Sequence, residues 1–240
     1  DIEIVFRKVT QNLLFNIYSI TSDIDVFIAF ETMNNRGKPL SNLELLKNRL
    51  IYLSTKFNAD EGERIQLRKR INDSWKGVYH YLGRNKERPL KDDLFLMNHF
   101  MIYFGHEIET EENLNSSRAR RLKSFYRDNY EDYLLEQKFN LKNLQAEGDK
   151  KLMINDVNNY IENLQKSVEV WFGLYNPTLT KEYEDEEKLL LDKFYRLGLG
   201  HFAPLLLICY LKKPNKATRL KLLTTLERFA FVSMLTAYRY

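Results

Sequence analysis

The sequence predicts a mainly α-helical fold: a multi-helix bundle that carries one fragmentary strand at its amino-terminal end. Glycine and proline are scarce, with 9 and 5 among 240 residues, which disfavours the many tight turns of an all-β fold. Apolar residues recur at helical spacing along most of the chain. Hydrophobic residues make up 44% of the total, which is enough to fill a substantial core.

The first residues predict a helix end followed by a strand. Residues 3–11 have the character of a helix end. The run LLFNIYSI, residues 13–20, is short and rich in β-branched and aromatic residues, which is typical of a strand. Because one strand is not stable alone, we expect the other strands of its sheet to lie upstream of Asp1.

Two helices and a tight corner come next. A helix over residues 25–35 is expected to end at Gly37, and a second is expected to begin at Ser41. Ser41 and Glu44 have the spacing of a capping box. The second helix presents leucines on one face at helical spacing, and these are Leu43, Leu46, Leu50 and Leu53.

The corner itself consists of Arg36, Gly37, Lys38 and Pro39. It is short, stiff and positively charged. A helix start presents free amides, and cations lie nearby, so the corner is a candidate site for an anion.

The rest of the chain predicts further helices, over residues 61–83, 92–105, 120–138, 153–175, 189–199, 203–212 and 219–239. In the first of these the expected inward residues are Ile65, Leu67 or Arg68, Ile71, Trp75, Val78 and Tyr79. In the helix over 153–175 they are Ile154, Val157, Ile161, Leu164, Val168 and Trp171. Gly198 marks a turn before the apolar helix over 203–212.

Charge is unevenly placed, although the net charge is only +4. Nine Lys or Arg stand against two acids between Arg64 and Lys91, and six stand against one between Lys212 and Arg228. The segment KEYEDEEK, residues 181–188, is acidic. Charge runs of this kind are usually solvated helix faces and loops. The alternative is a positive surface for nucleic acid.

Common catalytic motifs are missing from the sequence: there is no phosphate loop, nucleophile elbow, HExxH or paired CxxC. His99 and His106 are interpreted as packed or capping histidines, and no metal site is predicted. Asp92 and Asp93 are explained by capping of the helix that they precede. Cys209 lies in an apolar helix, where we expect a core residue and not a reactive thiolate.

Location also follows from composition. One cysteine gives no disulfide framework and nothing that favours secretion. No run reaches the length of about 18 apolar residues that a membrane span needs. We therefore expect a cytoplasmic protein without a membrane partner.

One stretch resembles a known family. VFIAFETMNNRGKPLSNLELLKN, residues 26–48, looks like the signature that follows the ParB-like amino-terminal module in the GmrSD family of modification-dependent restriction endonucleases. The matching positions are Phe30, Met33, Asn34, Arg36, Gly37 and Leu40. Later stretches agree with the family more loosely but in the same order.

The resemblance implies a part of a bacterial phage-defence protein. In that family an NTP-dependent ParB-like module is coupled through a helical region to an HNH-type nuclease domain, so DNA and a nuclease domain or subunit are the implied partners. NTP and Mg are the implied cofactors of the intact protein. The nucleotide- or DNA-binding residues implied here are Asn34, Arg36, Gly37 and Lys38, with Lys47 assisting, and none is catalytic.

The family pattern is incomplete in this chain. The Asp-Gly-Gln-Gln-Arg element of the ParB-like module has no counterpart here, and neither does the His-x-x-Pro nuclease motif. The sequence therefore leaves open whether the chain is an enzyme. We expect residues 1–58 to hold the remnant of the ParB-like module, the corner and the following helix, and residues 59–240 to form a helical domain.

Two functions stay open at this point. In the first, the chain is the helical DNA- or nucleotide-facing, or coupling, region of a GmrSD-like protein. In the second, it is a non-catalytic interaction scaffold or regulatory subunit that binds a protein partner. The corner likewise has two interpretations, a ligand-facing element or a plain junction in which Asn34 caps carbonyls and Arg36 is solvated.

Overall fold

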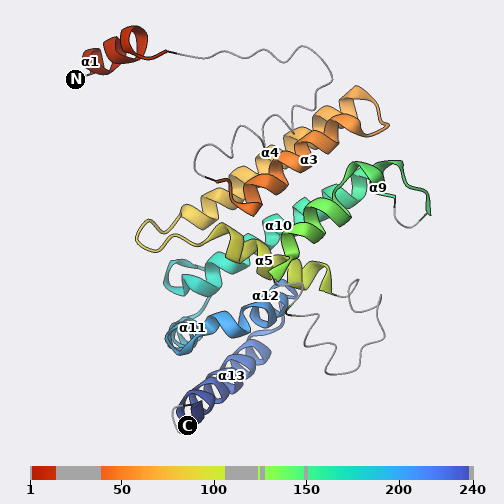
Figure 1. Ribbon diagram of the computed structural model, residues 1–240. Coiled ribbons are helices and arrows are strands. Elements are labelled where there is room, and N and C mark those ends of the chain that lie inside the picture. The colour runs from red at the N-terminus through yellow and green to blue at the C-terminus, as the bar shows by residue number, and fades with distance from the viewer. Residues whose placement is uncertain (1, 15–38, 106–123, 125–127, 149–150, 238–240) are drawn as a thin grey trace. The chain divides into compact units, whose positions relative to one another are not determined.

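The computed structural model describes residues 2–14, 39–105, 124, 128–148 and 151–237 (Figure 1). By packing, the chain divides into two units, Asp1–Pro39 and Leu40–Tyr240. The helix that follows Ser41, which we expected to belong with residues 1–58, therefore lies in the second unit. Each unit is described by itself below.

The described part of the first unit is a short helix. Helix α1 (Ile2–Arg7) continues into a wider π-helical turn, η1 (Lys8–Asn12), which confirms the expected helix over residues 3–11. Leu13 and Leu14, the first two residues of the expected strand, are described and form no strand, although the backbone of Leu13 is extended. The remainder of the expected strand, the helix over 25–35 and the corner from Arg36 to Lys38 lie outside the described residues.

The second unit is mainly helical, as the sequence predicts, and its described residues contain no strand. The longer helices are α3 (Asn42–Lys56), α4 (Glu61–Gly83), α5 (Asp92–Tyr103), α10 (Ile154–Tyr175), α11 (Asp185–Leu197), α12 (Ala203–Leu211) and α13 (Lys216–Ala237). Shorter elements are α8 (Tyr130–Asp132), η2 (Tyr133–Lys138), α9 (Leu141–Gln145), η4 (Pro177–Leu179) and η5 (Leu199–Phe202). The predicted helix over 120–138 is confirmed from Tyr130 to Lys138, in α8 and η2, but it is interrupted at Asn129, whose backbone is not helical.

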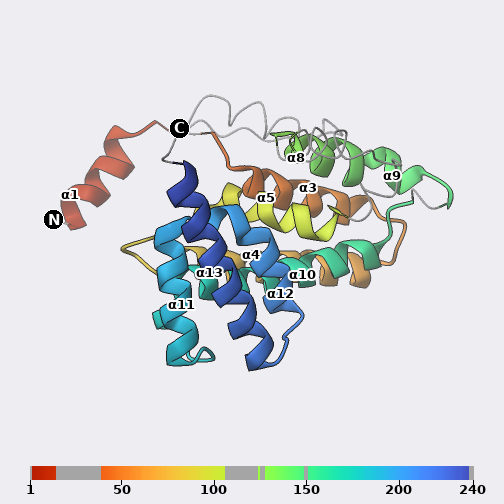
Figure 2. The ribbon, with the colours of Figure 1, turned by 90° about the horizontal axis from the view of Figure 1, so that it is seen from below.

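Helix α10 lies at the centre of this unit. It packs against α4, α5, α11 and α12, and Figures 1 and 2 show it running through the middle of the bundle. The expected inward face is confirmed at Val157, Ile161, Leu164, Val168 and Trp171, which are all buried. Ile154, in the first turn, is only partly buried. Helices α11 and α13 lie side by side (Figure 2).

Helix α4 has the predicted bounds but a slightly different inward face. Leu67, Ile71, Trp75 and Val78 are buried, with Ser74 and Leu82 beside them on the same face. The prediction that Ile65 points inward is wrong, since this residue is 53% exposed. Successive residues turn by about 100° around a helix, so Ile65 points away from the face that Leu67 buries. Tyr79, 36% exposed, lies at the edge of the face.

Helix α3 joins the core through its leucine face. All four predicted positions, Leu43, Leu46, Leu50 and Leu53, are fully buried. The indole Nε1–H of Trp75 donates to the Leu43 carbonyl at 3.0 Å. This buried hydrogen bond lets a large polar aromatic side chain lie between α3 and α4.

Gly198 forms the turn that the sequence predicts. Its φ of 104° is left-handed, a conformation that glycine adopts without steric cost, and it ends α11. The short turn η5 follows, and Pro204 lies in the first turn of α12, where a missing N–H does no harm.

The acidic segment over residues 181–188 differs from a solvated loop. Its last residues form the first turn of α11, and Glu187 is only 1% exposed. Glu187 accepts hydrogen bonds from the Tyr210 hydroxyl at 2.6 Å and from Arg219 Nε at 2.7 Å. Glu184 pairs with Lys216. The acidic segment therefore neutralises part of the basic segment that begins at Lys212.

His99 is a packed core residue, as expected, whereas His106 lies outside the described residues. The His99 ring is fully buried beside the rings of Phe95, Tyr103 and Tyr160. Its Nε2 lies 3.0 Å from Asn163 Oδ1. Burial lowers the pKa of His99 to about 4, although the hydrogen bond with Asn163 opposes the shift.

The neutral His99 predicts a loss of stability in acid. An unfolded histidine has a pKa of about 6.5, so below that pH the unfolded state binds more protons than the folded state. The contribution of His99 to the free energy of unfolding should fall by about 2 kcal/mol between about pH 7 and about pH 5. Urea unfolding at both pH values, for the wild type and for His99→Gln, measures it. Equal pH dependence in the two proteins would contradict a buried neutral imidazole.

Candidate functional site

The predicted site residues fall mostly outside the described part of the chain. Asn34, Arg36, Gly37 and Lys38 belong to the segment that the structure does not describe. Lys47 lies on α3 and is partly exposed. What the structure does describe is the start of α3, the point where the corner joins the helical unit.

The start of α3 contains the predicted capping box. The Glu44 N–H donates to Ser41 Oγ at 3.3 Å, and the Ser41 N–H donates to Glu44 Oε2 at 3.0 Å. Ser41 is extended, with φ −71° and ψ 158°, as an N-cap residue must be. The sequence pattern is therefore confirmed in full.

A carboxylate from a distant helix completes this cap. Asp93 Oδ1 accepts from the Asn42 N–H at 2.8 Å and from the Leu43 N–H at 3.4 Å. The interpretation of Asp93 as a cap of its own helix is thus wrong. The N-cap of α5 is Lys91, without a side-chain bond, and Asp93 caps α3 instead. Burial and the neighbouring Asp92 raise the pKa of Asp93, while the two amide hydrogen bonds oppose that shift.

Helix α8 also holds the start of α3. The Asn42 side-chain amide donates to the Tyr130 hydroxyl and to Glu131 Oε2, both at 2.9 Å. Burial raises the pKa of Tyr130 to about 12, so this hydroxyl stays protonated. Further along α3, Arg49 Nη1 donates to the Leu135 carbonyl at 3.0 Å.

These bonds leave no free amide among the first residues of α3, whereas the cations Arg36 and Lys38 of the expected anion site lie outside the described residues. The first amides of the helix are not free, because Asp93 accepts from Asn42 and Leu43, and Ser41 accepts from Glu44. Their partners and neighbours are acidic, so an added anion would meet repulsion there. The α3 start is an anchor for the corner and not a phosphate cradle.

Exposed cations gather on α4 and on the loop after it. From Lys69 onward the exposed cations are Lys69, Arg70, Lys76, Arg84, Lys86, Arg88 and Lys91, against the exposed acids Asp73 and Glu87, whereas the first turn of α4 carries the exposed acids Glu61 and Glu63. The predicted basic character of this segment is therefore displayed on the surface. The second basic segment differs, because Lys216 and Arg219 pair with Glu184 and Glu187.

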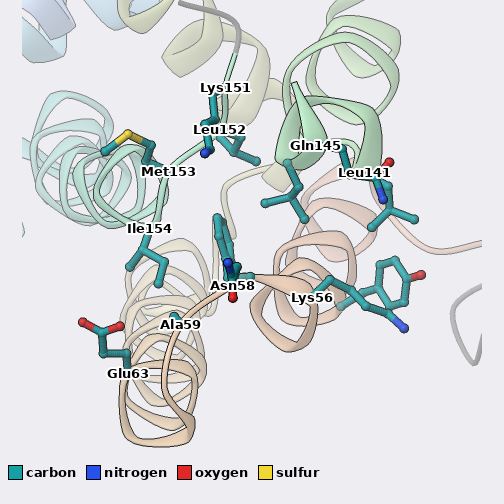
Figure 3. Close-up of a pocket in the computed structure, with 13 residues that line it drawn as sticks. Lys56, Asn58, Ala59, Glu63, Leu141, Gln145, Lys151, Leu152, Met153 and Ile154 are labelled. Atoms are coloured by element: carbon teal, nitrogen blue, oxygen red, sulfur yellow. The ribbon is translucent and has the colours of Figure 1, made fainter. Parts of the chain in front are cut away.

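A cavity of about 700 Å³ lies at the other end of α3 (Figure 3). Its lining comes from the end of α3, the start of α4, helix α9 and the first residue of α10. Apolar residues, among them Phe57, Leu144 and Leu152, meet two lysines, Lys56 and Lys151. In Figure 3, Glu63 and Lys56 lie at opposite edges of the lining. Glu63 is the one carboxylate in the described lining.

Neither a metal-binding cluster nor a reactive thiol occurs among the described residues. No group of three or more His, Cys, Asp or Glu in the described ranges is placed to hold a metal ion. Burial raises the pKa of the Cys209 thiol, which keeps it protonated and unreactive at neutral pH.

Comparison of the chain with protein-family models, curated proteins and solved structures found no match. Among the described residues, no single helix has both the length and the apolar character that a bilayer span requires. The bent pair Asp185–Leu197 and Leu199–Leu211, with 108° between its halves, meets that criterion only when the two are joined.

The α3 anchor predicts a clear difference between two substitutions. Asp93→Ala leaves two helix-start amides without an acceptor and should lower the free energy of unfolding by about 1–2 kcal/mol. Asp93→Asn keeps an acceptor oxygen and should lower the free energy of unfolding by clearly less than Asp93→Ala does. The control Asp73→Ala, at an exposed position of α4, should stay within about 0.5 kcal/mol. Urea unfolding measures all three, and equal effects of Ala and Asn at position 93 would contradict the cap.

Proposed function

We propose that this chain is the helical region of a GmrSD-like phage-defence protein that couples an upstream ParB-like module to DNA cleavage. In this proposal the corner residues Asn34, Arg36, Gly37 and Lys38 face DNA or the nucleotide site of that module, and residues 13–20 belong to its sheet. The intact protein is cytoplasmic, depends on NTP and acts with a nuclease domain or subunit.

The observation that carries the proposal is the anchored start of α3. The family-like signature runs directly into this point, and bonds from α5 and α8 fix it. Ser41 lies only a few residues beyond Lys38 in the sequence, so the signature ends at a fixed helix start. Binding groups on a fixed base lose less conformational entropy when they bind a ligand.

The cations of α4 and its following loop support DNA as the partner. They are exposed, and acids among them are few. A surface of this kind attracts a phosphate backbone without reading its sequence. That property suits a coupling region, which does not need to read the DNA sequence.

A protein-binding scaffold is the second candidate function. The last part of α13 presents large apolar side chains to solvent, including Phe229 at 60%, Val232 at 57% and Leu235 at 51% exposure. Contiguous apolar surface often marks a protein interface. This feature favours a partner protein independently of any contact with DNA.

Salt-dependent DNA binding separates the two functions. We expect the chain to bind a duplex of about 20 base pairs with an affinity that falls steeply as salt rises, because phosphate contacts release counterions. Arg36→Ala with Lys38→Ala should reduce the slope of log affinity against log salt by about 2. Fluorescence anisotropy over a salt series measures it.

The matched control replaces Lys193 and Lys221, two exposed lysines on α11 and α13, with alanine. This variant should keep the wild-type slope. Absence of a salt-dependent affinity in the wild type, or an equal loss in both double variants, would favour the scaffold.

A further inference from the structure

A second cavity, of about 580 Å³, lies at the end of the bundle where the ends of α4 and α10 meet two loops. One loop leads from α10 to α11, and the other leads from α12 to α13. Aromatic and charged side chains line it, among them Arg84, Phe172, Lys181, Tyr183, Lys213 and Arg219. This volume is within the range of about 300–1,000 Å³ typical of small-molecule sites.

The inner wall of the cavity is rigid. Glu187 accepts from the Tyr210 hydroxyl at 2.6 Å and from Arg219 at 2.7 and 3.2 Å, and Arg219 Nη1 donates to the Pro214 carbonyl at 2.8 Å. This network ties α11, α12 and the start of α13 together. It also engages Arg219, whose charge Glu187 balances, so that Arg219 supports the wall and is not the ligand-binding cation.

Tyrosine packing completes that wall. The rings of Tyr183 and Tyr210 meet edge to face with centroids 5.4 Å apart. Tyr183 lies directly on α10 because residue 173 is glycine: a Cβ there would be 2.6 Å from the Tyr183 hydroxyl oxygen. The cavity is therefore preformed and does not depend on a ligand to shape it.

Arg84 forms a flat platform at one side. Its guanidinium carbon lies 5.0 Å from the Phe172 ring centroid and 6.0 Å from that of Tyr81. The side chain is exposed, and no ion pair involving Arg84 occurs among the described residues. A guanidinium held on an aromatic face can stack a planar base on its other face.

Two lysines supply free positive charge. Lys181 and Lys213 are exposed, and neither takes part in an ion pair in the described ranges. Lys213 has φ 47°, the one positive value at a non-glycine residue of the described chain. Its N–H donates to the Tyr210 carbonyl at 3.0 Å, which holds the strained backbone in place. This left-handed residue ends α12 and directs the chain into the loop that borders the cavity.

The carboxylates narrow the class of ligand. Glu169 and Glu182 also line the cavity. They would repel a ligand that is only a polyanion, but they accept hydrogen bonds from amino groups. A ligand that fits all of these groups carries phosphate, a planar ring and hydrogen-bond donors.

We propose that this cavity binds a nucleoside phosphate, either free or as the phosphorylated end of a nucleic-acid strand. The base stacks on Arg84 and donates to Glu169 or Glu182, while Lys181 and Lys213 bind the phosphate. The site is distinct from the corner and does not depend on the function proposed above.

Calorimetric titration with the four ribonucleoside 5′-diphosphates, without divalent cations, tests the site. We expect at least one to bind with a Kd below about 1 mM. The double variant Lys181→Ala with Lys213→Ala should weaken binding at least about tenfold, since both phosphate partners are lost. Lys212→Ala, an exposed neighbour outside the lining, should leave the Kd unchanged.

Arg84→Lys tests the stacking role, because it keeps the charge and removes the planar group. Arg84→Lys should weaken the binding of nucleoside diphosphates several-fold but leave the binding of pyrophosphate unchanged. The control Arg88→Lys, outside the lining, should change neither affinity. Thermal unfolding of each variant checks that it folds.

Three results would overturn the proposal: no nucleotide binds, pyrophosphate binds as tightly as the nucleotides, or the lining variants bind as the wild type does. A 5′-phosphorylated single-stranded oligonucleotide identifies the source. If the oligonucleotide binds more tightly than the nucleoside diphosphate, the ligand is the end of a nucleic-acid strand. If it binds more weakly, the ligand is a free nucleotide. The Arg36 and Lys38 variant should keep nucleotide binding, so failure at the corner is distinguishable from failure here.

Discussion

Packing of α10 against its neighbours is the constraint on which the helical unit depends. Its inward face buries Val157, Leu164 and Trp171, and α4 presents Ile71 and Trp75 to the same core. The two cavities lie toward opposite ends of this helix: Ile154 lines one, and Phe172 lines the other. A change that displaced α10 would therefore alter both cavities at once.

Polar contacts between distant segments convert this packing into one definite arrangement. Asp93 of α5 caps α3, and Glu187 of α11 holds Arg219 of α13. Each carboxylate is at least partly withdrawn from water and makes several hydrogen bonds, so the loss of either partner would leave an unpaired polar group. The first contact fixes the start of α3, and the second fixes the inner wall of the second cavity.

Local pattern predicted the helices well, because periodicity, capping and glycine turns act over a few residues. The leucine face of α3, the Ser41 capping box and the turn at Gly198 could all be read from neighbouring residues. Pairs far apart in sequence could not. Asp93 acts 51 residues from Asn42, and Glu187 acts 32 residues from Arg219. The acidic run at 181–188 therefore looked solvated, and the start of α3 looked free to bind an anion. The convergence of Arg84, Lys181 and Lys213 on one cavity is equally long-range, because the three residues come from three different loops or helix ends.

Native-state hydrogen exchange tests the central role of α10 most directly. If the packing of α10 holds the helical unit together, its amides from Val157 to Trp171 should exchange only through global unfolding. Their opening free energy should then equal the free energy of unfolding measured with urea. The exposed second half of α13, from Phe229 onward, should open at much lower free energy. Exchange of the α10 amides at a lower opening free energy than those of α13 would contradict the account.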